Sequence, residues 1–281
     1  MKQFSINNSV IKNIAYLTML IDHFFAVVFT EIIRQHSMAG YETDLLIQIR
    51  SAGRAIGRVS FILFAFLAVE SFVYTRSRRN YLLRLGVFAL VSEIPFDLAF
   101  SGQIIDRNSQ NIFFTLFLGV LVLVVWEWAA KSLHMLNQPR ARRDMGWWVC
   151  IGVFRIVQFG SVMLGCTAAY FLRADYKYMG VLLIVTFYLM RGRAFILRVL
   201  MAGCVMYVGI WSINYLRYVD IYSTSYILRF SMRELYGLFA FIPIALYDGT
   251  KGRQLPKAVC YGFYPVYLLL LHGIARVITG I

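Results

Sequence analysis

The sequence predicts an all-α protein, a single polytopic bundle of about nine to ten transmembrane helices over residues 1–281. Three observations predict this fold class. Hydrophobic residues make up 60% of the chain, whereas soluble domains have about 45–50%. Only 15% of the residues are charged, and the mean hydropathy is +0.66. The apolar residues also form long runs without the alternation of a barrel strand, so helices are the expected spanning structure.

Nine apolar segments stand out in windows of about 19 residues. The sixth is short for a full span and is expected to be tilted, broken or re-entrant. Ahead of the second, residues 40–57 contain the apolar residues Leu45, Leu46, Ile47 and Ile49, followed by Arg50, Arg54 and Arg58. This pattern is typical of an amphipathic interfacial or re-entrant helix. The rough limits of the nine segments are 10–33, 58–75, 81–101, 111–130, 146–172, 178–191, 195–214, 234–248 and 257–278.

The orientation follows from the basic residues, which concentrate in alternate connections. Because cytoplasmic loops are rich in Lys and Arg, a cytoplasmic N-terminus and an external C-terminus are predicted, in the cell inner membrane. The net charge of +14 is also found in nucleic-acid-binding proteins. Here the charge is divided among short loops, which favours anionic membrane lipid or phosphate as partners and no nucleic acid. The basic connections that predict the orientation lie near residues 76–84, 131–143, 191–198 and 251–257, and Lys2 and Lys12 are on the same side.

Several classes of site have no signal in the sequence. The chain shows no P-loop, no GxSxG and no HExxH motif. The four cysteines are far apart, each lies in an apolar run, and none forms a CxxC pair. Free thiols and no metal site are therefore expected. The cysteines are Cys150, Cys166, Cys204 and Cys260.

The pair Asp22-His23 is the leading candidate for chemistry. It lies near the middle of the first apolar segment, with Lys12 near the start. Eleven residues at a rise of about 1.5 Å put His23 roughly 16 Å beyond Lys12, near the midplane of a bilayer core about 30 Å thick. An imidazole at that depth, with an acceptor fixing its tautomer, is a suitable general base. The structural alternative is an interhelical hydrogen bond.

Two further charges lie in the second segment. Arg58 opens it, and Glu70 lies deeper within it. They are about 18 Å apart along a helix and do not pair directly. Arg58 is a candidate partner for Asp22 or for a substrate carbonyl or phosphate, and the alternative is that its side chain reaches the interface. Glu70 is retained as a candidate catalytic group.

Basic residues of the loop after this segment are candidate ligands for a phosphorylated cofactor such as coenzyme A. The alternative is that they only set the topology. Arg54, one helical turn before Arg58, is grouped with them. The candidates are Arg54, Arg76, Arg78, Arg79 and Arg84.

Several short motifs follow one another along the chain. They are Lys12-Asn13-Ile14-Ala15, Met19-Leu20-Ile21-Asp22-His23, Gly53-Arg54, Gly57-Arg58-Val59-Ser60-Phe61, Glu70-Ser71-Phe72, Thr75-Arg76-Ser77, Tyr81-Leu82-Leu83-Arg84-Leu85, Glu93-Ile94-Pro95-Phe96, Asn111-Ile112-Phe113-Phe114-Thr115-Leu116, Asp175-Tyr176, Asp248-Gly249 with Lys251-Gly252, and Phe263-Tyr264-Pro265. The ordered set, which is more specific than any one piece, resembles the TraX family, integral membrane proteins whose namesake is linked to N-terminal acetylation of conjugative F-pilin.

The resemblance implies a membrane acetyltransferase that uses acetyl-CoA, with His23 as general base and Asp22 orienting the imidazole. Arg58 or Lys12 would stabilise the oxyanion. The spacing Lys12-x10-His23 is similar to the Arg-x10-His pattern of the membrane acyltransferases that O-acetylate sugars. The resemblance also implies a set of substrate-binding residues: Asn111, Asp175, Tyr176, Tyr264 and Tyr267.

The acceptor stays open between a pilin N-terminus, a cell-envelope glycan, a lipid and a peptide. The family usually shows Tyr-Pro-x-His near the C-terminus, and Tyr267 takes the His position here. A non-enzymatic transporter or pilus assembly subunit is the competing class. An enzyme predicts convergence of Asp22, His23 and Arg58 on a cavity open to the cytoplasm. A transporter predicts polar residues that reach both faces, and a scaffold predicts neatly paired charges without a cavity.

Overall fold

A computed structural model describes residues 5–136 and 145–280. Lys2 and the basic residues Arg140, Arg142 and Arg143, used above to predict orientation, lie outside this part. The described part is helical throughout, with only two isolated backbone bridges. The elements are α1 (Asn8–Ala26), α2 (Val28–Met38), α3 (Asp44–Tyr74), α4 (Arg78–Val91), α5 (Glu93–Ser101), α6 (Ile112–Leu136), α7 (Met145–Phe171), α8 (Lys177–Leu189), α9 (Phe195–Tyr218), α10 (Thr224–Ser231), the 3-10 helix η1 (Met232–Ala240), α11 (Phe241–Ala245) and α12 (Lys257–Thr279).

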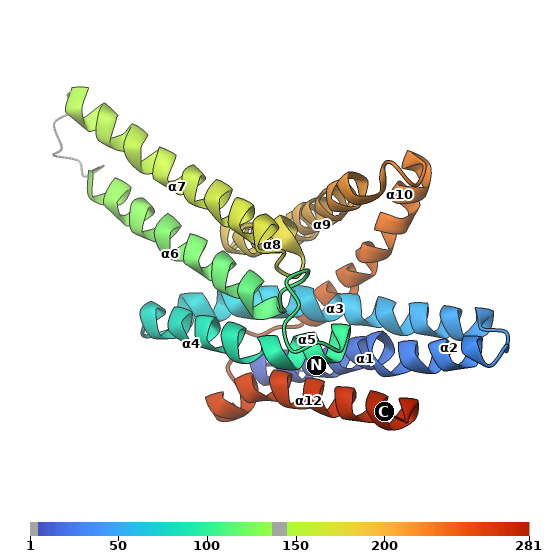
Figure 1. Ribbon diagram of the computed structural model, residues 1–281. Helices are drawn as coiled ribbons and strands as arrows, with labels where there is room; N and C mark the ends of the chain where they lie inside the picture. Colours follow the sequence, from blue (N-terminus) through green and yellow to red (C-terminus); the bar gives the residue numbers. More distant parts are fainter. Residues whose placement is uncertain (1–4, 137–144, 281) are drawn as a thin grey trace.

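Consecutive helices combine into longer rods, α1 with α2, α4 with α5, and α10 with η1 and α11 (Figure 1). Nine rods result in the described part. Six spans in it are long and apolar enough to cross a membrane: α1–α2, α3, α6, α7, α9 and α12. The sixth predicted segment is α8, a helix of 13 residues. At about 20 Å it is too short to cross the bilayer core. The prediction of an all-helical multi-pass membrane protein is confirmed.

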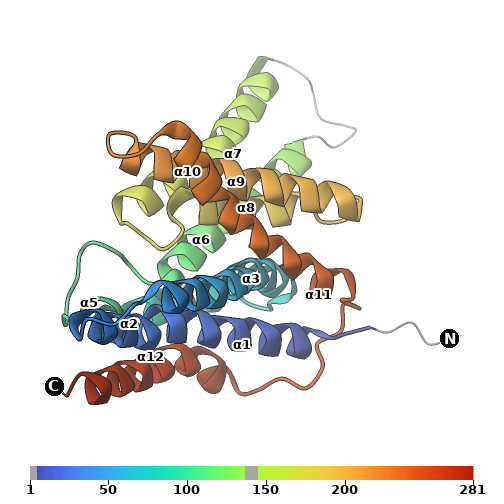
Figure 2. The same cartoon turned by 90° about the vertical axis from the view of Figure 1, so that its right-hand side faces the viewer.

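The rods form two groups. In Figures 1 and 2, α1–α2, α3, α4–α5 and α12 run side by side, while α6 to α10 rise from this layer. α3 packs against α1, α8 and η1, and α12 packs against α2 and α5. Eight of the 13 residues of α8 are buried, whereas α7 and α9 keep exposed apolar faces. Helix α8 is therefore an inner element, and its N-terminus starts inside the molecule.

The close approach of α1 and α3 depends on two glycines one helical turn apart. A Cβ at Gly53 would overlap the Phe25 ring, and a Cβ at Gly57 would overlap the Asp22 carboxylate. Small residues four apart are the usual way in which membrane helices bring their backbones together. Here they bring the carboxylate of Asp22 onto the backbone of α3.

The predicted separate interfacial helix over residues 40–57 is wrong. Residues 44–74 form one continuous helix, α3. The charges that indicated an interface are neutralised inside the bundle, because Arg54 pairs with Asp22 and Arg58 pairs with Glu234. A paired guanidinium can lie at a depth where an unpaired one would be too costly.

Ion pairs and hydrogen bonds gather the basic connections at one end of the bundle. Arg78 pairs with Glu127 at 2.7 Å, and Arg191 pairs with Glu70 at 3.3 Å. The Lys12 ammonium donates to Gln254. The predicted common side of these loops is thus reproduced by their contacts.

Candidate active site

His23 is held near the C-terminal end of α1. The helix begins with Asn7, whose side chain accepts from the Val10 N–H, and its last turn closes where the Val27 N–H donates to the His23 carbonyl. The imidazole faces α5 and α12. Its ring centroid lies 5.3 Å from that of Phe100, 5.9 Å from Tyr264 and 5.6 Å from Tyr267. The ring therefore lies in an aromatic cage, with 13% of the side chain exposed.

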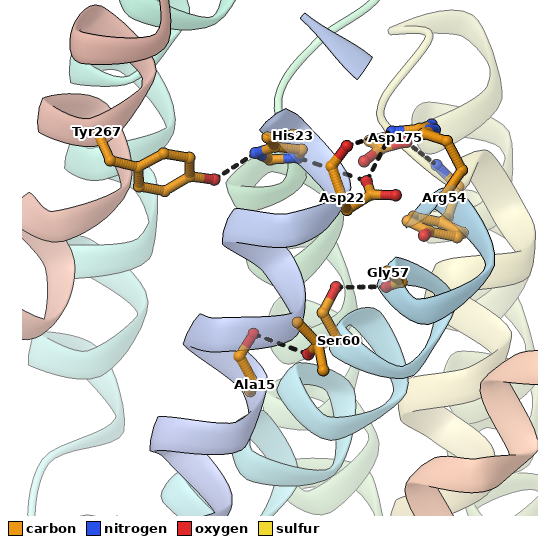
Figure 3. A network of polar contacts seen from close by, with 10 residues as sticks. Ala15, Asp22, His23, Arg54, Gly57, Ser60, Asp175 and Tyr267 are labelled. Atoms are coloured by element: carbon orange, nitrogen blue, oxygen red, sulfur yellow. Dashed lines mark hydrogen bonds and ion pairs between the residues drawn. The ribbon is translucent and has the colours of Figure 1, made fainter. Parts of the chain in front are cut away.

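The two imidazole nitrogens have different neighbours. Nδ1 is hydrogen-bonded to the Tyr267 hydroxyl, which points at it from α12 (Figure 3). Nε2 lies 3.9 Å from Asp22 Oδ2. This distance is too long for a hydrogen bond but short enough for a strong electrostatic effect.

Asp22 lies between the imidazole and the guanidinium of Arg54. Arg54 Nη1 donates to Asp22 Oδ2 at 2.7 Å. Asp22 Oδ1 is buried and has no hydrogen-bond partner among the described residues. The carboxylate thus keeps one acceptor oxygen free at the α1–α3 contact.

A second charged layer continues from Arg54 toward η1 and the N-terminus of α8. Arg58 Nε lies 3.2 Å from Glu234 Oε1, and the Arg58 guanidinium also hydrogen-bonds Tyr176. The Tyr176 ring stacks on Phe61 with centroids 3.8 Å apart. The sequence did not single out Glu234, although an acidic residue at the edge of an apolar segment was an available signal.

Asp175 belongs to the connection between α7 and α8, outside the spanning helices. Its carboxylate accepts from the Tyr176 N–H at 3.0 Å, and its carbonyl accepts from Thr115. Burial raises the pKa of Asp175 to about 6, and the nearby Asp22 carboxylate acts in the same direction, against Arg58 and Arg54. Five residues that were predicted to have separate catalytic, cofactor-binding and substrate-binding roles thus meet in one network: Asp22, Arg54, Arg58, Asp175 and Tyr176.

A cavity of about 620 Å³ lies between α1, α3, α4 and α12. Its rim carries basic side chains, and its depth is mostly apolar and aromatic. Glu70 lies in its wall, where it pairs with Arg191. The lining comprises Asn8, Lys12, Tyr16, Met19, Phe64, Leu67, Ala68, Glu70, Ser71, Tyr74, Thr75, Arg76, Tyr81, Arg84, Leu85, Ile112, Phe113, Leu116, Tyr247, Gly249, Lys251, Gln254, Leu255, Cys260, Tyr261 and Tyr264.

The cavity points toward His23. Its α1 wall is the stripe Asn8, Lys12, Tyr16 and Met19, whose spacing of three and four residues marks one helix face. His23 is the next position of that stripe. On α12, Tyr264 lines the cavity and Tyr267 lies one turn further. The His23–Tyr267 pair is thus the layer directly below the cavity floor, which Met19 and Tyr264 form.

The predicted phosphate ligands divide into two sets. Arg76 and Arg84 line the cavity together with Lys12 and Lys251. Arg84 Nε is buried without a hydrogen-bond partner in the described chain, so the wall holds a free donor. Arg78 points away to Glu127, Arg79 is exposed outside the lining, and Arg54 belongs to the Asp22 network. The sequence did not single out Lys251 as a phosphate ligand.

Asn111 has a local structural role. Its side-chain amide donates to the Ala89 carbonyl at 2.7 Å and to Glu93, and its side-chain oxygen accepts from the Phe113 N–H at 3.0 Å. The side chain is fully buried. These contacts fix the start of α6 beside α4 and α5, and they occupy the donors and the acceptor that a substrate would need.

A second hollow, between α9 and η1–α11, has an entirely apolar lining that includes Phe195, Val199 and Leu238. It offers no polar group to orient a substrate. The cavity beside α1 is therefore the candidate active site. Among the described residues, no group of three or more His, Cys, Asp or Glu side chains is arranged to hold a metal ion.

Comparison with known families agrees with the ordered motifs. The model of the family described as TraX protein matches residues 7–275. The chain belongs to the TraX family. No curated protein and no solved structure matches it. The matched range includes the residues of the cavity, the Asp22-His23 pair and the charged network.

Proposed function

We propose that this TraX protein is a membrane acetyltransferase, which moves an acetyl group from acetyl-CoA to an acceptor amine or hydroxyl with His23 as the proton acceptor. One observation carries the proposal. The cavity has a basic rim at one end, and its helix-α1 wall leads along a single face to His23.

The residues present fit the donor. Coenzyme A has phosphates at one end and an uncharged arm that ends in the thioester. The phosphates match Lys12, Arg76, Arg84 and Lys251 at the rim, and the arm matches the apolar depth. The Arg84 guanidinium is part of the cavity lining, so it is placed to bind a phosphate oxygen.

Lys12 is assigned to donor binding in this proposal. It lies about 16 Å from His23 along the helix axis, too far to stabilise an oxyanion there. Arg58 is engaged by Glu234 and Tyr176. Lys12 and Arg58 were the two predicted candidates for stabilising the oxyanion. The basic residue connected most directly to the imidazole is instead Arg54, which pairs with Asp22 beside His23.

In this reaction, aromatic side chains exclude water from the site and the His23 imidazole accepts a proton. The aromatic cage of Phe100, Tyr264 and Tyr267 covers the imidazole. His23 removes a proton from the acceptor as it attacks the thioester carbonyl. Asp22 favours the imidazolium that forms, as the aspartate of a catalytic triad does.

None of Asp22, His23 and Arg58 lines the cavity, so the convergence on one cavity that an enzyme predicts is not seen in the lining. The proposal is supported instead by the face of α1 that leads from the lining to His23, and by polar atoms that lack a partner in the described part of the chain. A scaffold of neatly paired charges would leave neither Asp22 Oδ1 nor Arg84 Nε without a partner.

Acetyl-CoA binding to the purified protein tests the donor. Replacing Arg84 and Lys251 together by Ala should weaken binding about tenfold or more, because each charged hydrogen bond is worth about 1.5–3 kcal/mol. Arg79→Ala, on the same helix as Arg84 but outside the cavity lining, is the matched control. Equal affinities for the two variants would contradict the donor site.

A mass shift of 42 Da on a cellular product that depends on this protein tests the transfer. His23→Ala should abolish it, while His36→Ala, an exposed histidine of α2, should not. Continued transfer by a folded His23→Ala variant would rule out the proposed role of the imidazole.

A further inference from the structure

The contacts of His23 determine which of its nitrogens is basic. Asp22 is a carboxylate, because Arg54 pairs with it at 2.7 Å. A carboxylate oxygen 3.9 Å from Nε2 attracts an N–H and repels a lone pair. The proton of the neutral imidazole therefore lies on Nε2, and the lone pair lies on Nδ1.

That lone pair points at Tyr267. The hydroxyl of Tyr267 is hydrogen-bonded to Nδ1, so it is the hydroxyl that donates. Tyr267 is 5% exposed, and its ring packs against Phe263 and Tyr264, at centroid distances of 5.1 and 5.8 Å. The Tyr267 hydroxyl therefore occupies the lone pair of Nδ1, and a proton can reach this nitrogen by way of that hydroxyl.

We propose that Tyr267 is a catalytic residue of this site, a relay that carries the proton of the acceptor to His23. The inference rests on the proposed function and assigns Tyr267 a role beyond substrate contact. The Tyr267 hydroxyl, the His23 imidazole and the Asp22 carboxylate lie in a row, and Arg54 pairs with Asp22 at the far end of this row (Figure 3).

The step balances without a further reactant. The acceptor nitrogen or oxygen bonds to the thioester carbonyl carbon, its proton passes to Tyr267 Oη, and the Tyr267 proton passes to His23 Nδ1. The carbon–sulfur bond then breaks, and the thiolate of coenzyme A takes the proton back along the same path. The products are the acetylated acceptor and free thiol, with Tyr267 and His23 restored.

Nitrogen-15 NMR of the histidines tests the hydrogen bond independently of activity. The full-length protein should show His23 protonated on Nε2, with a hydrogen-bonded Nδ1, assigned by loss of the signals in His23→Ala. Tyr267→Phe keeps the ring and should move the Nδ1 resonance downfield. Tyr226→Phe, an exposed tyrosine, should not. A proton on Nδ1 in the unmodified protein would overturn the relay.

The mass shift of 42 Da on cellular product provides the second readout. Tyr267→Phe should lower transfer about 10²-fold or more, with acetyl-CoA affinity unchanged. If Tyr267→Phe folds poorly, fluorotyrosine at position 267 keeps the hydroxyl and should shift the pH profile of transfer. Full activity of Tyr267→Phe with an inactive His23→Ala overturns the relay alone. An active His23→Ala overturns the proposed function.

Discussion

At the scale of single residues, the floor of the cavity is the most consequential feature. Tyr264 is 3% exposed, and it separates the lined space from the His23–Tyr267 pair. A thioester reaches His23 only if the Tyr264 ring turns aside. The side chain at this position therefore controls access separately from donor binding at the rim.

Replacing Tyr264 by Trp tests this separation. The larger indole should block passage past Met19, so transfer should fall by about tenfold or more, while the affinity for acetyl-CoA stays the same. Tyr264→Phe, which keeps the size of the ring, should retain transfer. A parallel loss of affinity in Tyr264→Trp would instead mean that the donor already occupies the floor.

Asp175 gives a prediction for pH. Its pKa in the folded protein is about 6, against an ordinary value of 3.8. The folded state thus holds the proton more tightly than the unfolded state, so the ionised form of Asp175 costs stability above pH 6, and this cost disappears as the pH falls toward 3.8. Asp175→Asn keeps an oxygen for the Tyr176 N–H.

Melting temperatures in detergent, measured between pH 5 and 7.5, check this cost. Asp175→Asn should be more stable than the unmodified protein at pH 7.5, by a few degrees, and the difference should shrink toward pH 5. A constant difference across this range would show that Asp175 does not titrate there.

At the scale of elements, the contact of α1 with α3 positions the site. Gly57→Ala would push its methyl group into the Asp22 carboxylate. We expect a loss of about 1–3 kcal/mol in unfolding free energy, and a further loss of acetyl transfer because Arg54 no longer meets Asp22. Gly152→Ala is the control, since open space surrounds Gly152 on α7.

Thermal unfolding of the two variants measures the loss of stability, and the mass of the cellular product measures the loss of acetyl transfer. Wild-type behaviour of Gly57→Ala would show that α1 and α3 separate without cost, and that the Asp22–Arg54 pair does not need this close approach.

The elements also show what a sequence can and cannot predict. Long apolar runs located most spans, and the depth of Asp22-His23 follows from helix rise alone. The interfacial helix before Arg58 was wrong, because its charges are neutralised by Asp22 and Glu234, residues distant in sequence. The periodicity of apolar residues along one helix does not indicate which distant residues will pair with its charges. The same applies to Tyr267, whose contact with His23 joins the first and last spans.

At the scale of the whole molecule, the positive loops share one end with the cavity rim. The sequence predicts that this end faces the cytoplasm, where acetyl-CoA is made. In a variant without native cysteines, Asn80→Cys should resist an impermeant maleimide in intact cells, because it follows the basic Arg78-Arg79 pair. Gln103→Cys, in the exposed connection after α5, should react. The reverse pattern would put the rim outside and exclude cytosolic acetyl-CoA.

The family and the order of its motifs were predictable because they depend on short local patterns, and the match over residues 7–275 confirms the family. The cavity was not predictable, since its walls come from residues near both ends of the chain. Arg76 and Arg78 are two positions apart, yet one lines the cavity and the other pairs with Glu127. Only the packing of α4 and α6 distinguishes them.

The helices that form the walls of the cavity are synthesised at different times. α1, α3 and α4 leave the ribosome first, and α12, which supplies Cys260, Tyr261 and Tyr264, leaves last. Until α12 inserts, the basic groove lacks its fourth side and His23 lacks the tyrosines that cover it. Ligand capture would therefore require α12, and a chain that has inserted only its earlier helices would not bind the proposed donor.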